Sequence, residues 1–217
     1  MTADLFETVG DLRPPREAMA DGAVLLRGFV KPYESELVAS LRVIVAEAPF
    51  RRMFTPGGHQ MSVAMTNCGN AGWVTDHSGY RYDGFDPVSG KPWPAMPPEF
   101  RTLAETAADE GGFAGFSPDA CLINRYVPSA RMSLHQDKNE NDFGAPIVSV
   151  SLGLPATFLF GGPKRADRPQ RYRLEHGDVV VWGGPSRLFF HGVAPLADGD
   201  HAAMGPQRIN LTFRKAH

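Results

Sequence analysis

The sequence predicts a mostly β domain with flanking helices, of the α+β class, and three observations support this. The 217 residues are 42% hydrophobic and 21% charged, enough to bury a core in one large domain. The 23 glycines and 19 prolines indicate many short turns, which suits a β-rich architecture. From Asp119 onward, short runs of period two recur between Gly and Pro residues, which is typical of a β sandwich or barrel.

The N-terminal half predicts two helices and two strands. Residues 23–29 form an apolar run that ends at a glycine, and residues 61–66 alternate loosely like a second strand. Apolar residues at three- and four-residue steps predict helices over 34–48 and 98–110. Gly111 follows the second of these and favours its end there. The strands expected after Asp119 cover residues 120–127, 145–152, 156–160, 171–174, 178–182, 187–191 and 207–214.

Charge and cysteine content exclude several classes of protein. The net charge of −2 lacks the basic excess of a typical nucleic-acid binder, although a local basic patch can still serve that role. Cys68 and Cys121 are too few for a disulfide framework or a zinc knuckle, so we interpret them as reduced thiols of a cytoplasmic protein. Residues 1–10 have no signal-peptide pattern, and no run approaches the ~20 apolar residues of a membrane span.

One histidine–carboxylate pattern indicates a metal site. His135 and Asp137 follow an expected strand, and in an extended chain they project to the same side. His191 lies further along the chain, between an apolar run and a glycine. Two imidazoles and one carboxylate leave three positions of an octahedron open, as in non-haem Fe(II) oxygenases. A His-x-Asp pair also arises by chance in a chain with 7 histidines and 24 acidic residues.

The last expected strand gives this pattern more weight. Its residues alternate strictly, so Arg208, Asn210, Thr212 and Arg214 share one face while the apolar residues share the other. One interpretation is an edge strand whose polar face meets water. The other is a polar face that lines a barrel interior, where buried guanidinium groups need an anion such as a dicarboxylate. Tyr126 shares a face with Leu122 and Asn124 on an earlier strand and could donate to the same anion.

Five motifs together resemble the bacterial AlkB DNA-repair dioxygenases, and the likeness runs from about residue 20 to Arg214. They are Asn124-Arg125-Tyr126, Leu134-His135-Gln136-Asp137-Lys138, the segment His176–Gly184, the alternating strand Arg208–Arg214, and the segment Thr55–Gly69.

The resemblance implies a double-stranded β-helix, or jelly roll, with an N-terminal nucleotide-recognition lid. It implies a lead-in at 1–22, an N-terminal extension with the lid at 23–97, and a catalytic core at 98–217, all within one structural domain. Fe(II) would be held by His135, Asp137 and His191. The implied co-substrates are 2-oxoglutarate and O2. The residues implied to bind 2-oxoglutarate are Asn124, Tyr126, Arg208, Asn210 and Arg214, with Arg208 at the distal carboxylate and Arg214 near the metal-proximal end.

The implied activity is repair of alkylated DNA by oxidative demethylation of 1-methyladenine and 3-methylcytosine, with release of formaldehyde, succinate and CO2. A methyl group on a Watson–Crick edge lies inside the duplex, so the substrate would be single-stranded or have its base flipped out. RNA remains open as a substrate. No membrane and no obligate protein partner are expected.

The resemblance also implies substrate contacts. Trp73 would stack on the base, with the His135 ring on the other face, and Tyr80 would touch the phosphate backbone. A second set of implied positions comprises Arg165, a substrate contact within the basic run Lys164, Arg165, Arg168, Arg171 and Arg173, and the lid residues Thr55, Met61 and Ser62. His59 in the lid has no role that we carry over.

Asn139 departs from the family pattern, in which an aspartate stands at this position. A carboxylate favours cationic lesions, whereas an amide accepts a hydrogen bond without charge. We therefore expect Asn139 to give a weaker preference for cationic over neutral lesions.

Two other functions remain open from the residues alone. One keeps the iron chemistry but hydroxylates a small molecule or a protein side chain. The other is a non-catalytic β-barrel binding module in which His135 and Asp137 are surface residues. The Trp73–Tyr80 region and the basic run argue against a small molecule or protein side chain as the substrate.

Overall fold

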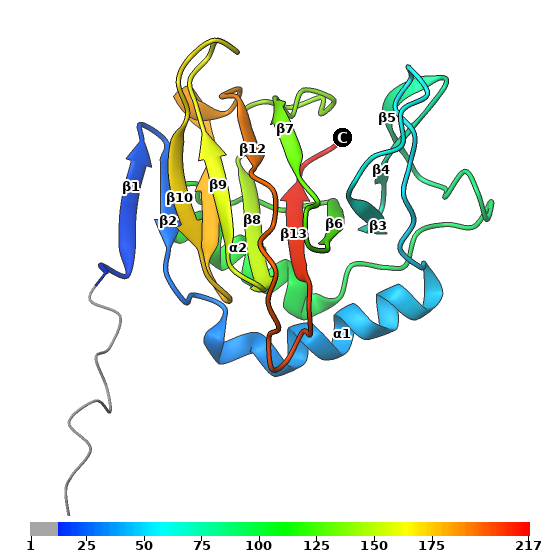
Figure 1. Ribbon diagram of the computed structural model, residues 1–217, viewed down its shortest axis with the longest axis horizontal. Coiled ribbons are helices and arrows are strands. Elements are labelled where there is room, and N and C mark those ends of the chain that lie inside the picture. The colour runs from blue at the N-terminus through cyan, green and yellow to red at the C-terminus, as the bar shows by residue number, and fades with distance from the viewer. Residues whose placement is uncertain (1–12) are drawn as a thin grey trace, which may run out of the picture.

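Two antiparallel sheets face each other in the computed structural model, which describes residues 13–217 (Figure 1). The larger sheet has the strand order β1 (Arg16–Ala20), β2 (Ala23–Leu26), β11 (Val179–Trp182), β8 (Ile147–Gly153), β13 (Arg208–Arg214), β6 (Ala120–Tyr126) and β3 (Ala64–Gly69). The smaller sheet has the order β10 (Gln170–Leu174), β9 (Ala156–Phe160), β12 (His191–Val193) and β7 (Met132–His135). A separate hairpin consists of β4 (Gly72–Asp76) and β5 (Gly79–Asp83). This is the expected mostly β architecture with a jelly-roll core.

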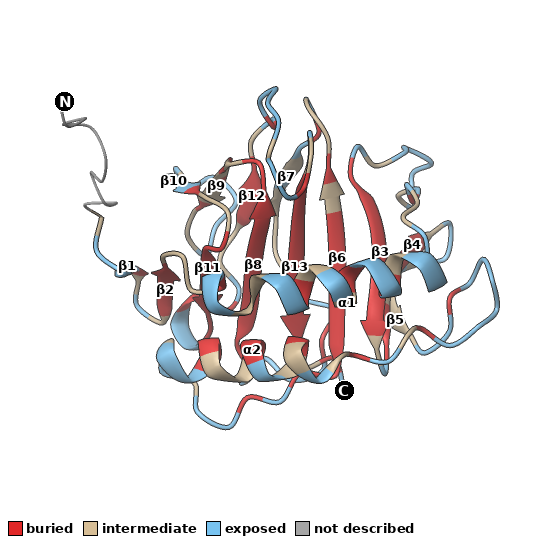
Figure 2. Cartoon of the chain, turned by 90° about the horizontal axis from the view of Figure 1, so that it is seen from below, coloured by how far each residue is buried: buried red, intermediate tan, exposed pale blue. Residues whose placement is uncertain are grey.

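Two helices cover the outer face of the larger sheet (Figure 2). They are α1 (Glu34–Glu47) and α2 (Pro98–Glu110), and both match the ranges expected from apolar spacing to within one residue. Each helix buries its apolar stripe and leaves its charged face in water, as a surface helix must. Two short 3-10 turns, η1 (Lys31–Tyr33) and η2 (Gly184–Ser186), complete the helical elements of the described residues. Within residues 13–217, no helix has both the length and the apolar composition to cross a bilayer.

Strand β13 lies between β8 and β6 in the middle of the larger sheet, and its two faces serve two different environments. Ile209, Leu211 and Phe213 belong to the apolar core between the sheet and the helices. The alternate residues, from Arg208 to Arg214, face the space between the two sheets and line a cavity there. The strict alternation in the sequence is therefore confirmed, and the interpretation of β13 as a water-exposed edge strand is wrong.

Several element boundaries differ from those expected. Arg16–Ala20 form an edge strand on β2, whereas we expected residues 1–22 to be a lead-in. The expectation of no signal peptide in residues 1–10 lies outside the described residues, which begin at 13. β2 ends at Leu26 because Gly28 turns the chain with φ +60°. The strand expected at 187–191 is instead a turn followed by β12, since η2 ends at Ser186 and β12 begins at His191.

The strand β7 and the β4–β5 hairpin were not expected. β7 is short and only half-buried, and the β4–β5 hairpin is built from glycines and aromatic residues that lack a clear period of two. The hairpin stands beside β3 at the end of the larger sheet (Figure 1). Residues of β7 and of the hairpin both line the cavity, so these strands matter for function despite their weak sequence pattern.

The two cysteines are free and buried, as expected of reduced thiols. Although 53 positions apart in the chain, Cys68 on β3 and Cys121 on β6 are register partners. Their separation in sequence therefore says nothing about their distance in the fold.

Phe213 provides a test of this core. Its ring is fully buried and packs edge-on against Phe100 of α2, with 5.9 Å between ring centroids. Phe213→Ala should lower the free energy of unfolding by about 3–5 kcal/mol, because it leaves a cavity between sheet and helix. Urea denaturation measures this change, and Val43→Ala, at a side chain 60% exposed on α1, should change it by no more than about 0.5 kcal/mol. Equal effects of the two substitutions would contradict the packing described.

Candidate active site

A cavity of about 820 Å³ opens between the two sheets, and every site residue expected from the sequence lines it. The larger sheet supplies its floor through β6 and β13, and β7 and β12 of the smaller sheet supply the facing wall. Residues 55–65 and the β4–β5 hairpin border the opening. The cavity therefore joins segments that are far apart in the sequence.

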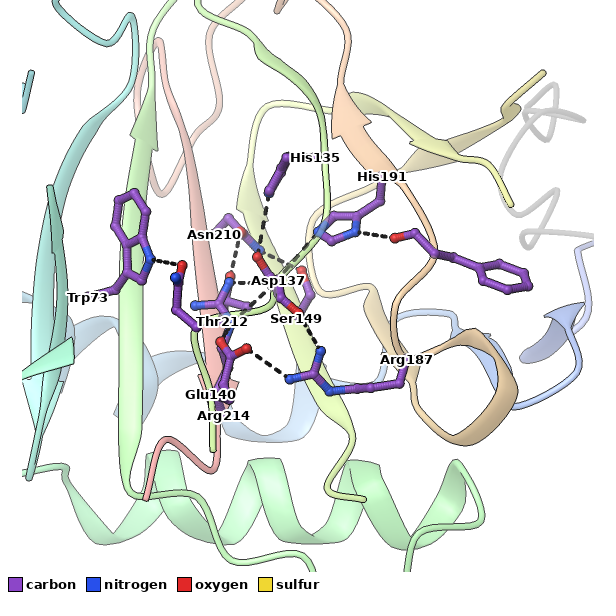
Figure 3. A network of polar contacts seen from close by, with 12 residues as sticks. Trp73, His135, Asp137, Glu140, Ser149, Arg187, His191, Asn210, Thr212 and Arg214 are labelled. Carbon is purple, nitrogen blue, oxygen red and sulfur yellow. Dashed lines mark hydrogen bonds and ion pairs between the residues drawn. The ribbon is translucent and has the colours of Figure 1, made fainter. Parts of the chain in front are cut away.

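His135, Asp137 and His191 converge on one point in this cavity (Figure 3). Their candidate ligand atoms lie within 4.8 Å of one another. The Nε2 atom of His135 is 3.6 Å from Asp137 Oδ1, and the Nε2 atom of His191 is 3.7 Å from Asp137 Oδ2. β7 and β12 are paired so that the two histidines are register partners, while Asp137 follows two residues after β7 ends. These separations suit one ion shared by two imidazoles and a carboxylate.

Backbone carbonyls fix the orientation of both rings. Nδ1 of His135 lies 2.8 Å from the carbonyl oxygen of Ser133, and Nδ1 of His191 lies 3.0 Å from that of Phe189. A carbonyl only accepts hydrogen bonds, so each neutral ring carries its proton on Nδ1 and offers the Nε2 lone pair to a metal. Burial, with a contribution from His191, lowers the pKa of His135 to about 4. The ring is therefore neutral at pH 7, as a metal ligand must be.

Asp137 is ionised and held by an arginine. Arg214 donates from Nη2 at 2.6 Å and from Nε at 3.1 Å to Asp137 Oδ2. Burial alone would raise the pKa of Asp137, but the Arg214 guanidinium outweighs this effect, so the pKa of Asp137 lies well below its ordinary value. The carboxylate is thus available to a cation throughout the neutral range.

Glu140 and Arg187 extend this pair into a buried ring of charges. Glu140 Oε1 lies 3.4 Å from Arg214 Nε, and Glu140 Oε2 accepts from Arg187 Nη2 at 3.1 Å. Arg187 closes the ring, because its Nη1 donates to the main-chain carbonyl of Asp137 at 2.8 Å. The side chains of Glu140 and Arg187 are only 2% and 3% exposed. Two cations and two anions thus neutralise one another around the ligand segment.

Deeper in the cavity, Arg208 has no acidic partner among the described residues. The residue is 1% exposed, and its Nη2 donates to Ser151 Oγ at 2.9 Å while Nε and Nη1 lack a hydrogen-bond acceptor. The guanidinium lies over the Tyr126 ring at 5.1 Å, and burial lowers its pKa. A buried cation with free donors calls for an anionic ligand, and a carboxylate matches the planar guanidinium.

Two amides flank this arginine. Asn210 donates to Ser149 Oγ and to the Val150 carbonyl, at 2.8 and 2.9 Å. Its Oδ1 accepts from Thr212 and, at 3.4 Å, from Asn124, whose own Oδ1 is buried without a partner. Polar groups are therefore available for a second ligand beside the triad.

Aromatic and basic side chains surround the opening. Trp73 and Tyr80 stack on each other with 5.6 Å between centroids and 23° between planes, and Tyr80 is 48% exposed. Trp73 Nε1 donates to Asn139 Oδ1 at 3.1 Å. The exposed Arg165, whose guanidinium lies over Phe190 at 5.9 Å, also lines the opening. Met61, Thr55, Ser62 and His59 border the same side.

Sequence reasoning missed three residues of the site, Tyr82, Glu140 as a buried ion, and Arg187. The one available signal was the position of Arg187, a charged residue directly before the apolar run Leu188-Phe189-Phe190. Nothing in the local pattern of Tyr82 or Glu140 separates them from surface residues.

Comparisons with known proteins agree on one family. The profile of the 2OG-Fe(II) oxygenase superfamily matches residues 22–214. The chain is 56% identical over 213 residues to the alpha-ketoglutarate-dependent dioxygenase AlkB of Escherichia coli, which covers 98% of this chain and 97% of the relative. It is 35% identical to the DNA N(6)-methyladenine demethylase ALKBH1C of Arabidopsis thaliana, over 89% of this chain and 48% of that protein. Among solved structures, that of OsALKBH1 is similar with a TM-score of 0.80 and 29% identity, covering 93% of this chain and 100% of the other.

The triad geometry predicts one metal site. The full chain should bind one Co(II) ion per molecule, detected by its visible absorption, and His191→Ala should weaken binding by more than about 100-fold because one of three ligands is lost. His77→Ala is the control, since His77 is exposed outside the triad. Unchanged affinity in His191→Ala would show that the metal binds elsewhere.

Proposed function

The chain belongs to the 2OG-Fe(II) oxygenase superfamily and, within it, to the bacterial AlkB family, and on this basis we propose that it demethylates alkylated bases in nucleic acids. It is an Fe(II)- and 2-oxoglutarate-dependent dioxygenase. The observation that carries the proposal is the convergence of His135, Asp137 and His191 beside an unpaired buried Arg208, beneath an opening lined by Trp73. The favoured substrates are 1-methyladenine and 3-methylcytosine in DNA, and RNA is the alternative substrate.

The three metal ligands, Arg214 and Arg208 each have a separate role in the proposed reaction. When bound, Fe(II) with 2-oxoglutarate and O2 supplies the oxidising power that hydroxylates the methyl group, and the product then releases formaldehyde. His135, Asp137 and His191 hold the metal, and Arg214 keeps Asp137 ionised and oriented. Arg208 pairs with the distal carboxylate of 2-oxoglutarate, because no acidic side chain of the described residues neutralises it.

Asn124, Tyr126 and Asn210 complete the co-substrate site. All three residues line the cavity with Arg208, and the Asn124 amide and the Tyr126 hydroxyl each carry a hydrogen that a carboxylate can accept. Arg214 acts at the metal-proximal end through its contact with Asp137. These roles are consistent with residues that are buried, paired on one side and open toward the cavity.

The substrate base enters at the aromatic opening. A methylated Watson–Crick edge is inaccessible in a duplex, so the base has to be flipped out or come from a single strand. Trp73 supplies a flat surface, and such stacking contributes ~1–3 kcal/mol per base. Tyr80 stacks on Trp73 in the structure, which leaves its exposed hydroxyl edge to contact the backbone phosphate.

Basic residues near the opening attract the phosphates. Arg165 lines the cavity, and Lys164, Arg168, Arg171 and Arg173 are exposed nearby in sequence. Exposed cations neutralise phosphates and release counterions, so nucleic-acid binding should weaken as the salt concentration rises.

Met61, together with Thr55 and Ser62, borders the base on the lid side. The cytoplasm is the expected compartment, and it stays a prediction.

Two competing functions receive less support. A hydroxylase of a small molecule or protein side chain would use the same metal, but it would not need the Trp73–Tyr80 stack beside Arg165. A non-catalytic binding module is ruled out by membership of the oxygenase superfamily.

Two measurements test the proposal. Fe(II) and 2-oxoglutarate added without oxygen should give a visible charge-transfer band, since both bind at one metal. Release of formaldehyde from an oligonucleotide that carries 1-methyladenine, and none from the unmethylated oligonucleotide, then identifies the substrate class. A charge-transfer band without formaldehyde release would favour the small-molecule or protein hydroxylase.

Replacement of the anchor arginine should act on the co-substrate alone. Arg208→Met keeps the side-chain volume but leaves the distal carboxylate unpaired, so the KM for 2-oxoglutarate should rise about 100-fold, as expected for a broken buried ion pair. The matched control is Arg125→Met, because Arg125 is on β6 beside Tyr126 and lies over Phe50 at 4.9 Å. If Arg208→Met leaves this KM unchanged, Arg208 is not the anchor.

Asn139 sets the charge that the base meets. Asp137 is the one carboxylate among the described residues lining the cavity, and Arg214 already holds it. Asn139→Asp should therefore raise the ratio of 1-methyladenine to 1-methylguanine turnover, because a new carboxylate favours the cationic lesion. Competition between the two lesions in one oligonucleotide mixture measures the ratio, and an unaltered ratio would refute the role of residue 139.

A further inference from the structure

Residues 72–83 form a hairpin that carries Trp73, and two adjacent hydrogen bonds attach it to the segment that follows the metal ligand Asp137. Trp73 on β4 and Tyr82 on β5 are register partners. The indole Nε1 of Trp73 donates to Asn139, and the Tyr82 hydroxyl donates to Glu140 Oε1 at 2.6 Å. Two paired residues of the hairpin therefore bind two consecutive residues of the 137–140 segment.

The Tyr82 bond connects the hairpin to the buried charge ring. Glu140 also contacts Arg214 and Arg187, both of which hold Asp137. The phenol ring of Tyr82 is packed edge-on against His217, with 6.4 Å between centroids, and burial raises the pKa of its hydroxyl well above the ordinary value. The hydroxyl is therefore protonated and donates to a carboxylate whose position is already set by two guanidinium groups.

Contacts between β4 and β5 hold the two strands together, so that fixing the position of β5 also fixes that of β4. Arg81 contacts Asp76 at 3.0 Å and Asp83 at 3.5 Å, which ties the two strands together. Asn67 on β3 holds the main chain of Trp73 on both sides, through its Oδ1 at 3.0 Å and its Nδ2 at 3.1 Å. The main chain of β4 is thus fixed to the larger sheet. Thr75 Oγ1 donates to the Phe54 carbonyl at 3.2 Å and Trp93 Nε1 donates to the Asp83 carbonyl at 2.9 Å, while Asn139 and Glu140 connect the hairpin to the segment after Asp137.

We propose that Tyr82 is a positioning residue that holds the Trp73 stacking surface at a fixed distance from His135, Asp137 and His191 through Glu140. The inference rests on the proposed function. Asn139 is exposed and can exchange its indole partner for a substrate base, whereas Glu140 is buried and keeps its bond to Tyr82. Tyr82 therefore maintains the hairpin position when the base binds, and no chemistry at the reacting atoms is assigned to it.

Tyr82→Phe tests this role, since it removes the hydroxyl and keeps the ring. The KM for a methylated oligonucleotide should rise about tenfold, the low end for losing a hydrogen bond to a charged group, with a smaller change in kcat. The KM for 2-oxoglutarate, measured by its decarboxylation without nucleic acid, should stay within about twofold of wild type because the contacts of Arg208 are untouched. Tyr172→Phe is the matched control, because Tyr172 is on β10, away from the β4–β5 hairpin. Its hydroxyl donates to the Met19 carbonyl on β1 and to Gln170 Oε1 on β10.

A second readout does not depend on turnover. The ¹H–¹⁵N indole resonance of Trp73, assigned with Trp73→Phe, should shift in Tyr82→Phe and stay in place in Tyr172→Phe, in the full chain with Zn(II) and 2-oxoglutarate. An indole resonance and an oligonucleotide KM both equal to wild type would overturn the proposal, as would a parallel loss of 2-oxoglutarate turnover. If wild type releases no formaldehyde but the indole resonance shifts, the proposed function fails while the hairpin contact stands.

Discussion

The contact between Arg214 and Asp137 is the interaction on which the site depends. A lone carboxylate buried next to two imidazoles would cost several kcal/mol of solvation, and it would tend to take up a proton. Arg214 removes that tendency, and Glu140 with Arg187 neutralises the arginine in turn. Because every charge in this ring has a partner, the ligand segment is rigid before any ion arrives. Loss of one member would leave its partners buried and unpaired, which is why the four residues act as a unit.

The second constraint is the double role of β13. Its apolar residues fill the space under α1 and α2, while its polar residues supply the co-substrate anchor and the partner of Asp137. Arg208 is set deep in the cavity and Arg214 beside the metal ligands, six residues apart on one strand. A slip of one residue in the register with β6 would exchange the two faces, and it would bury three apolar side chains in the active site. Packing and chemistry are therefore specified by the same seven residues.

Much of this arrangement could be predicted from the sequence. Both helices follow from apolar spacing, the two faces of β13 from strict alternation, and the grouping of His135, Asp137 and His191 from motif resemblance. What could not be predicted depends on tertiary contacts. Nothing in the local sequence distinguishes the buried Glu140 from an exposed glutamate, because the partners that accompany its burial, Arg187, Arg214 and Tyr82, are all far away in the chain.

The missed strands have a similar cause. The β4–β5 hairpin is half-buried and rich in aromatic residues, so it has no apolar face of its own to produce a period of two. The run from Arg187 to Phe190 looks like a strand because it is apolar, but η2 and the Arg187 contacts turn the chain before β12 begins. In both places a functional requirement of the cavity overrides the local propensity.

The hydrogen bonds between the two histidine rings and backbone carbonyls affect which metal ion the protein binds. Ser133 and Phe189 set the rings, and the charge ring sets the carboxylate, so the triad is ready for any divalent ion that accepts two nitrogens and one oxygen. Such donors bind nickel, copper and zinc more tightly than ferrous iron in the Irving–Williams order. The three donor types by themselves do not exclude these rival ions. The supply of free ions around the folded chain therefore contributes to whether iron occupies the site, and zinc bound there, which has no redox chemistry, would inhibit the protein without unfolding it.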